Sequence, residues 1–123
     1  MKLNETQLKE IEENGYVILP DRFSNEEINN LRKAMTTVFK EKTEANIIEK
    51  SSGVVRTAMG LHLRNKIFDD LTRHPNFFEP ARQIRGHNLY IQQTKINVKA
   101  AFTGEVWQWH YDCLLYTSDA ADE

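Results

Sequence analysis

Helix-like periodicity dominates the first part of the chain and strand-like alternation the last part, and this order constrains the fold more than any other feature. The clearest helix signal is the capping box Ser24-Asn25-Glu26-Glu27, in which the Ser24 hydroxyl and the Glu27 carboxylate each satisfy an amide at the helix start. Apolar side chains then recur at three- and four-residue steps, which predicts a helix to about Lys42. These apolar positions are Ile28, Leu31, Met35, Val38 and Phe39.

Three further helices are expected from their start and stop signals. One covers residues 4–14 and ends at Gly15, and a second covers residues 65–72. The third starts at Pro75, a residue suited to the first helical turn, and ends at Gly86.

Strand signals are concentrated toward the end of the chain. A short β-rich run covers Tyr16–Leu19, and possible strands lie at 46–48 and 54–57. Longer candidates cover 89–99 and 106–112. Because helices precede the main strands, the order favours an α+β fold over a fold of alternating βαβ units.

Length and charge exclude several classes of protein. A chain of 123 residues with 40% hydrophobic side chains is expected to form one domain with a modest core. No apolar run approaches the roughly 18 residues of a membrane span, and the N-terminal residues lack the apolar segment of a signal peptide. A formal charge of -2 gives no reason to expect a nucleic-acid-binding protein, which would normally carry a basic face. The single cysteine cannot form an internal disulfide. These features predict a cytoplasmic protein that binds neither nucleic acid nor membrane.

The C-terminal segment 113–123 reads like the translation of a transposase-end sequencing adapter. Its sequence is Cys-Leu-Leu-Tyr-Thr-Ser-Asp-Ala-Ala-Asp-Glu. Segments of such origin are left out of fold reasoning, so we expect residues 1–112 to be the N-terminal part of a larger domain and 113–123 not to be native. This tail contains three of the 18 acidic side chains and the single cysteine, so the rest of the chain has 16 basic and 15 acidic side chains. The adapter would include the last base of codon 112, so the native residue there would be Asp or Glu.

The segment Trp107–Asp112 carries the most informative polar pattern. In a strand, residues i and i+2 point to the same face, so His110 and Asp112 would project side by side. An imidazole and a carboxylate placed in this way can hold two adjacent positions of one metal ion, and a second histidine would complete the facial triad of non-haem Fe(II) oxygenases. The same pair also suits Zn²⁺ or Mn²⁺, and a surface histidine bonded to a carboxylate would show the same spacing.

The candidate strand 89–99 divides into a polar and a more apolar face. Gln93, Lys95, Asn97 and Lys99 alternate on the polar face, and Tyr90, Thr94, Ile96 and Val98 lie on the other. A solvated edge strand would show this pattern. A barrel strand that lines a binding site would show it too, with a lysine to pair an anionic co-substrate.

Four segments together resemble the phytanoyl-CoA dioxygenase family. They are Gly15–Ser24, Arg56–Pro75, Leu89–Lys99 and Trp107–Asp112, and the similarity covers nearly all of residues 10–112. The family consists of Fe(II)- and 2-oxoglutarate-dependent dioxygenases. The resemblance implies N-terminal helices followed by the first strands of a double-stranded β-helix (jelly roll), which would be incomplete in this chain.

The resemblance also implies roles for five residues. His110 and Asp112 match the first two iron ligands, and Lys99 matches a position that contacts 2-oxoglutarate. Asn97, on the same strand face, is a second candidate for the co-substrate, and Gln93 matches a position near the substrate. The family's second histidine ligand and its 2-oxoglutarate-binding arginine would follow residue 112. The upstream histidines are expected to support the fold or to lie at the surface. They are His62, His74 and His87.

These observations predict part of an oxygenase that uses Fe(II), 2-oxoglutarate and O₂ to hydroxylate a small organic substrate. The 123-residue chain itself is expected to be inactive, because it lacks the remaining ligands. Two alternatives stay open at this stage. One is a non-catalytic jelly-roll module that binds a ligand or partner, and the other is a zinc hydrolase using His110 and Asp112.

Overall fold

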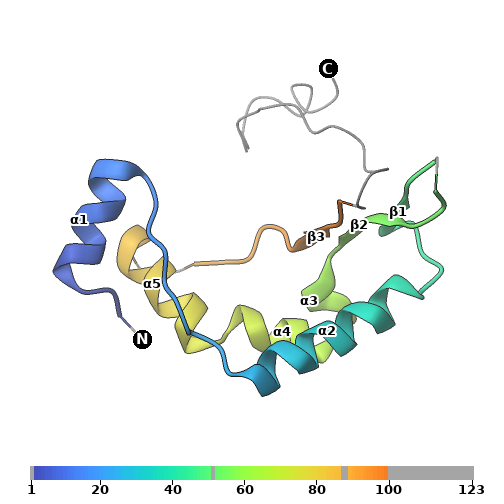
Figure 1. The fold of residues 1–123 in the computed structure, drawn as a ribbon, viewed down its shortest axis with the longest axis horizontal. Helices are drawn as coiled ribbons and strands as arrows, with labels where there is room; N and C mark the ends of the chain where they lie inside the picture. The colour runs from blue at the N-terminus through green and yellow to red at the C-terminus, as the bar shows by residue number, and fades with distance from the viewer. Residues whose placement is uncertain (1, 51, 87–88, 100–123) are drawn as a thin grey trace.

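The computed structural model describes residues 2–50, 52–86 and 89–99. Within these ranges helices and strands are mixed, with a small antiparallel sheet beside a group of helices (Figure 1). In chain order the elements are α1 (Glu5–Asn14), α2 (Asn25–Phe39), β1 (Asn46–Ile48), β2 (Val55–Met59), α3 (Leu61–Arg64), α4 (Lys66–Thr72), α5 (Pro75–Arg85) and β3 (Lys95–Asn97). The α+β expectation is confirmed at this level.

The first two helices begin where their sequence signals predict, and the first also ends there. Asn4 caps α1 in a capping box with Gln7, and Gly15 ends it in the left-handed conformation at φ 81°. At the start of α2 the Ser24 hydroxyl accepts from the Glu27 N–H at 3.2 Å, and the Glu27 carboxylate accepts from the Ser24 N–H at 2.7 Å. The local side chains therefore determine these boundaries, with α2 ending a few residues before the expected Lys42.

The later helices are also close to expectation, with one addition. Asn65 caps α4, and Pro75 occupies the first turn of α5 as predicted. The four-residue helix α3 was not expected, because so short a helix shows no apolar periodicity. It follows Gly60, whose positive φ of 64° lets the chain turn directly from β2 into α3.

The sheet has the order β1-β2-β3, with both pairs antiparallel. The strands expected at 46–48 and 54–57 are confirmed, the second as β2 with a small shift, and a bulge interrupts the β1 pairing between Ile47 and Ile48. The strand expected over 89–99 is shorter than predicted, because β2 offers pairing partners to only three of its residues. The candidate strand 106–112 lies outside the described residues.

The run Tyr16–Leu19 was expected to be a strand and is not one in the structure. Burial still alternates along it, since Tyr16 is 61% and Ile18 75% exposed while Val17 and Leu19 are half-buried. A strand requires backbone partners as well as this alternation. No described strand pairs with the run, so its β-rich composition alone does not make it one.

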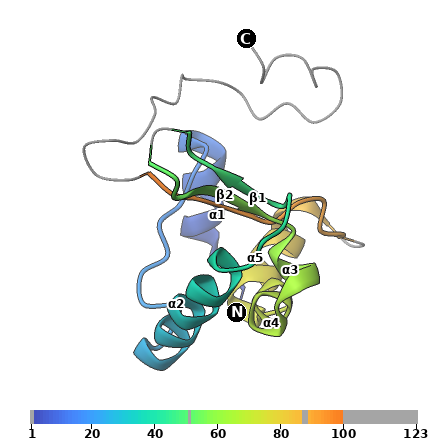
Figure 2. The ribbon, with the colours of Figure 1, turned by 90° about the vertical axis from the view of Figure 1, so that its right-hand side faces the viewer.

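The main core lies between one face of the sheet and helices α2, α3 and α4 (Figure 2). Its buried members are Ala34, Val38, Ala58, Leu61 and Phe68. Ile96 of β3 packs against this cluster and stands opposite Ala58 in the strand register. Because side chains alternate along a strand, the neighbouring positions of β2 and β3 face away from the helices.

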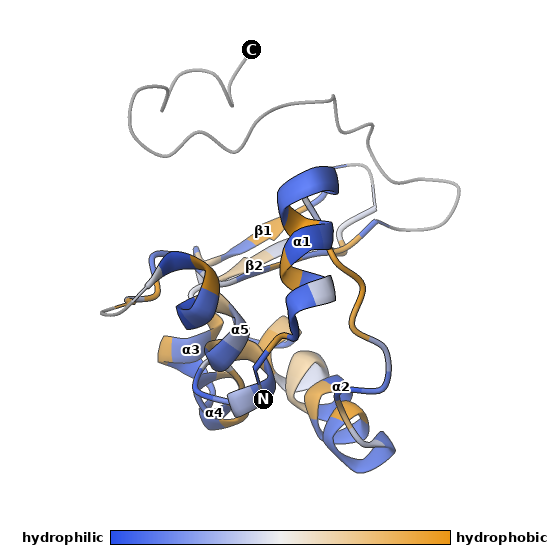
Figure 3. Cartoon of the chain, turned by 90° about the vertical axis from the view of Figure 1, so that its left-hand side faces the viewer, coloured by the Kyte–Doolittle hydropathy of each residue, from blue (hydrophilic) through white to orange (hydrophobic). Residues whose placement is uncertain are grey.

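Helix α1 lies beside α5, apart from this core (Figure 1). Leu3 is buried, and the Gln83 side chain of α5 holds its backbone at both ends. Gln83 Oε1 accepts from the Leu3 N–H at 2.7 Å, and Gln83 Nε2 donates to the Leu3 carbonyl at 3.0 Å. Polar residues cover most of α1, whereas α2 carries apolar and polar stripes (Figure 3). None of the described helices combines the length and apolar character needed to cross a membrane.

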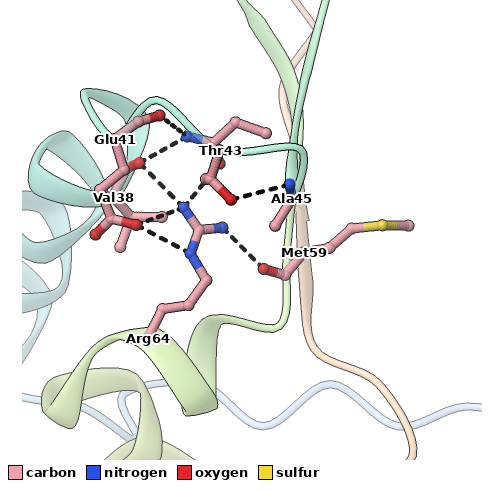
Figure 4. Close-up of polar contacts among 7 residues, drawn as sticks. Val38, Glu41, Thr43, Ala45, Met59 and Arg64 are labelled. Carbon is pink, nitrogen blue, oxygen red and sulfur yellow. Dashed lines mark hydrogen bonds and ion pairs between the residues drawn. The ribbon is translucent and has the colours of Figure 1, made fainter.

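A largely buried arginine joins the end of α2 to the sheet (Figure 4). Arg64 Nη2 contacts Glu41 Oε2 at 2.7 Å and Asn46 Oδ1 at 3.0 Å, while Nη1 donates to the Met59 carbonyl at 2.9 Å. Asn46 in turn donates to the carbonyls of Val38 and Glu41, at 2.8 and 2.9 Å. The network therefore supplies side-chain donors to carbonyls in the last turn of α2 and in the segment after it.

Candidate functional site

The polar residues that the sequence singled out lie in β3 and directly before and after it. Gln93, Lys95, Asn97 and Lys99 are all exposed, whereas the alternate positions Thr94, Ile96 and Val98 are half-buried. Ile96 points toward the helices, so its strand neighbours Lys95 and Asn97 face the opposite side of the sheet. The predicted division into two faces is confirmed for β3 itself, whereas Tyr90, predicted on the more apolar face, is 83% exposed.

Hydrogen bonds hold both ends of this segment against β2. The Gly60 N–H donates to the Thr94 carbonyl at 2.8 Å, and the Val98 N–H donates to the Arg56 carbonyl at 2.7 Å. At the Thr94 end, His62 also contacts the segment. Its ring Nδ1 lies 2.7 Å from Thr94 Oγ1, and its backbone N–H donates to the same oxygen at 3.3 Å. Pairing therefore extends one residue beyond β3 in each direction, to Thr94 and Val98, so Asn97 lies within the paired stretch and Lys99 directly follows it.

Asn97 has a partner that sequence reasoning did not find. Thr57 stands directly opposite it in the strand register, and Thr57 Oγ1 donates to Asn97 Oδ1 at 3.0 Å. The carbonyl end of the Asn97 amide is thus occupied, and its NH₂ end is left to donate elsewhere. Thr57 lies in a segment that was expected to be a strand, but nothing local in the sequence relates it to a residue 40 positions away.

These exposed side chains include two hydrogen-bond donors. Lys99 supplies an ammonium group and Asn97 an amide, both hydrogen-bond donors and both exposed. In the part of the chain that the structure describes, no group of three or more His, Cys, Asp or Glu side chains could hold a metal. The two expected metal ligands, His110 and Asp112, lie outside the described residues.

Of the upstream histidines, two have contacts that serve the fold. His62 holds the start of β3, as above, and His74 caps α5 by accepting the Asn76 N–H at 3.2 Å on Nδ1. The neutral His74 ring then carries its proton on Nε2, which lies 3.2 Å from Glu27 Oε1. His87 lies outside the described residues.

Two hollows lie among the helices rather than on the β3 face. The larger, of about 520 Å³, is lined by Leu19, Asp21, Arg22, Phe23, Ile28, Asn76, Phe77 and Pro80. The smaller, of about 270 Å³, is lined by Phe23, Glu27, Asn30, Leu31, Ile67, Asp70, Leu71 and His74. Neither shares a lining residue with the polar face of β3, so neither belongs to this candidate site.

The fold alters the ionisation of the Glu27 carboxylate. The backbone N–H of Ser24 first, then its hydroxyl and the nearby His74, hold the pKa of Glu27 below its ordinary value of 4.5. A carboxyl whose pKa is lower in the folded chain than in the unfolded chain stabilises the fold at pH values above its unfolded pKa. This contribution is lost as the pH falls through its folded pKa. Glu27 therefore links the start of α2 to the start of α5 in a pH-dependent way.

We expect Glu27→Gln to lower the free energy of unfolding at neutral pH. Below about pH 4.5 the difference in this free energy between the variant and wild type should become smaller. The amide cannot supply the charged partner of Ser24 and His74, whereas the wild-type carboxylate loses its charge only in acid. Urea unfolding across this pH range measures both curves. Glu26→Gln in the same helical turn is the matched control and should change stability less. A constant difference between Glu27→Gln and wild type down to pH 3 would contradict the linkage.

A family model described as phytanoyl-CoA dioxygenase (PhyH) matches residues 11–122. Among curated proteins, an ectoine dioxygenase from Bordetella bronchiseptica is 31% identical over 114 residues, covering 89% of this chain and 37% of that protein. An L-proline trans-4-hydroxylase from Streptomyces griseoviridis is 31% identical over 98 residues, covering 80% of this chain and 37% of that protein. The chain thus spans little more than a third of these relatives.

A solved structure agrees with the sequence comparisons. The crystal structure of EctD from S. alaskensis with bound Fe superposes with a TM-score of 0.81 and 25% sequence identity. The match covers 88% of this chain and 40% of that one. The arrangement of helices and antiparallel strands described above is therefore similar to the corresponding part of an iron-bound protein.

Proposed function

Because the chain belongs to the phytanoyl-CoA dioxygenase family, we propose that it is part of an Fe(II)- and 2-oxoglutarate-dependent oxygenase that hydroxylates a small organic substrate. The observation that carries the proposal is the family match over residues 11–122. The exposed Asn97 amide, held by Thr57, and the exposed Lys99 ammonium two residues further along support it. Two relatives whose names state a dioxygenase and a hydroxylase activity support the reaction type.

In this proposal the sheet of the described residues is the beginning of a double-stranded β-helix. Helices cover one face of the sheet, and the other face carries the polar side chains of β3. In a barrel-like fold the inward-facing positions of each strand alternate with the outward-facing ones. The polar face of β3 would then line the interior, where a ligand binds.

Lys99 and Asn97 are proposed to bind 2-oxoglutarate, and Gln93 to lie beside the substrate. Alternate residues of a strand are about 7 Å apart, so the three side chains would spread over about 20 Å along one face. A carboxylate of 2-oxoglutarate would accept from the Lys99 ammonium and the Asn97 NH₂. Gln93, at the opposite end, would contact the substrate. The reacting carbon of the substrate would then lie between Gln93 and the bound 2-oxoglutarate.

His110 and Asp112 are proposed to hold the iron, in agreement with the i, i+2 spacing of a strand. When bound, Fe(II) supplies the O₂ chemistry that couples decarboxylation of 2-oxoglutarate to succinate with hydroxylation of a C–H bond. The protein's own contribution is to orient the two organic molecules and to exclude water from them. Two protein ligands hold Fe(II) weakly, so the 123-residue chain is proposed to be inactive.

The test is succinate production from 2-oxoglutarate. A gene that continues past codon 112 with native sequence should yield Fe(II)-dependent succinate, and the 123-residue chain should yield no more than its His110→Ala variant. A longer protein that binds a ligand but forms no succinate would instead support the non-catalytic binding module. Zinc rather than iron in the purified longer protein would support the hydrolase. The sequencing read across codon 112 tests the adapter origin of 113–123.

In the longer protein, Lys99→Ala is expected to raise the KM for 2-oxoglutarate about 10- to 100-fold. The removed contact is a charge-assisted hydrogen bond to a carboxylate, which contributes about 1.5–3 kcal/mol. Steady-state kinetics with varied 2-oxoglutarate measures the change. Lys66→Ala, which removes an exposed lysine of α4 that pairs with Asp70, is the matched control and should leave the KM unchanged. An unchanged KM in Lys99→Ala would exclude this lysine from the co-substrate site.

A further inference from the structure

We propose that Thr57 is a positioning residue for the co-substrate, acting through Asn97. The inference rests on the proposed function, because it takes Asn97 as a 2-oxoglutarate contact. It adds a residue on a different strand whose side chain would not touch the co-substrate. Its role would be to set the orientation in which the Asn97 amide meets a carboxylate.

The geometry of the pair supports this role. Thr57, Ile47 and Asn97 form one row across the three strands, with Thr57 in the middle. Thr57 is only 5% exposed, whereas Asn97 is exposed. The Thr57 hydroxyl donates to Asn97 Oδ1 at 3.0 Å. A buried, strand-anchored hydroxyl thus holds one end of a side chain whose other end faces solvent.

The chemical consequence follows from the asymmetry of an amide. Asn can present either an acceptor or two donors to a ligand, and the two ends exchange by rotation about χ2. With Oδ1 bonded to Thr57, the NH₂ is directed away from β2. A carboxylate needs donors, so this orientation is the productive one, and holding it in advance reduces the ordering required when the anion binds. β-branched Thr57 is itself restricted in χ1, which makes it a stiff anchor.

The inference predicts different results for two substitutions at one position. Thr57→Val has nearly the same shape but no hydroxyl, so the Asn97 amide should rotate freely while the exposed Oδ1 is hydrated. Thr57→Ser keeps the hydroxyl and should retain most of the orientation. Thr36→Val, on the exposed side of α2, removes a hydroxyl that bonds only the Arg32 carbonyl among the described residues and controls for general effects of the exchange.

The first measurement needs no iron and no turnover. In the ¹⁵N-labelled 123-residue chain, the Asn97 side-chain amide is identified by its loss in Asn97→Ser. Its heteronuclear NOE should resemble that of the ordered backbone in wild type and in Thr57→Ser. In Thr57→Val it should fall to the value of an exposed side chain such as Asn29. An unchanged NOE in Thr57→Val would overturn the positioning role, whatever becomes of the proposed function.

The second measurement is titration of the same chains with 2-oxoglutarate, followed by amide shifts. Thr57→Val should weaken apparent binding about fivefold, the effect of one neutral hydrogen bond, and Thr57→Ser less than twofold. In an Asn97→Ala background the Thr57→Val change should disappear. If it persists there in full, Thr57 does not act through Asn97. A third outcome is that neither Asn97→Ala nor Lys99→Ala alters 2-oxoglutarate binding, although the NOE of Asn97 still responds to Thr57→Val. This would exclude the proposed co-substrate site, and with it the role of Thr57 toward the co-substrate.

Discussion

Replacing Arg64 with methionine is expected to lower the free energy of unfolding by about 3 kcal/mol. The side chain is only 15% exposed, and its guanidinium contacts the Glu41 carboxylate, the Asn46 amide oxygen and the Met59 carbonyl. Methionine can fill the space but donates no hydrogen bond. Four acceptors at the junction of α2, β1 and β2 would then lose a donor, including the Val38 carbonyl at 3.4 Å. Losing the partner of a buried polar group costs more than the net gain from forming the bond.

Urea unfolding followed by circular dichroism measures this effect, and a variant already unfolded in buffer would also meet the expectation. Arg73→Met is the matched control, because Arg73, directly after α4, is 73% exposed and pairs with Asp69 one turn earlier in that helix. Such a surface pair contributes about 0.2–1 kcal/mol. Arg64→Lys should recover less than half of the loss, because one ammonium cannot reach acceptors that the planar guanidinium contacts from three nitrogens. Equal effects of Arg64→Met and Arg73→Met would show that the network does not stabilise the fold.

Removing either proposed metal ligand, by His110→Ala or Asp112→Ala in the longer protein, is expected to reduce succinate formation more than about 100-fold. Loss of a group that merely supports a metal ligand already costs about 10- to 100-fold in affinity or activity, so loss of a ligand itself should cost more. Iron content of the purified protein and 2-oxoglutarate turnover are the two measurements. Both should fall together, since binding of the metal precedes the chemistry.

His74→Ala is the control for removing a histidine. Its imidazole caps α5 and pairs with Glu27, so the variant should lose stability but keep its iron. Full iron content and turnover in His110→Ala would refute the ligand assignment, and with it the facial triad proposed for this family member.

Much of the helical part of the fold could be predicted because its signals are local. The capping boxes at Asn4 and Ser24, the proline at the start of α5 and the glycines at positions 15 and 86 act within a few residues. The predictions failed where a partner was needed. Tyr16–Leu19 has the composition of a strand but no described strand beside it, and the segment 89–99 is a strand only where β2 reaches it.

For the candidate site, alternation along the chain predicted that Gln93, Asn97 and Lys99 share a face. In the structure all three are exposed and Asn97 lies on the outer face of β3. Motif similarity indicated the family, which the family model confirms. Which residues support that face and the core below it could be seen only once the chain was folded. The Thr57–Asn97 bond joins positions 40 apart and the Arg64–Glu41 pair positions 23 apart. Strand register and buried polar contacts depend on how segments distant in the sequence pack together. A local sequence pattern does not contain that information.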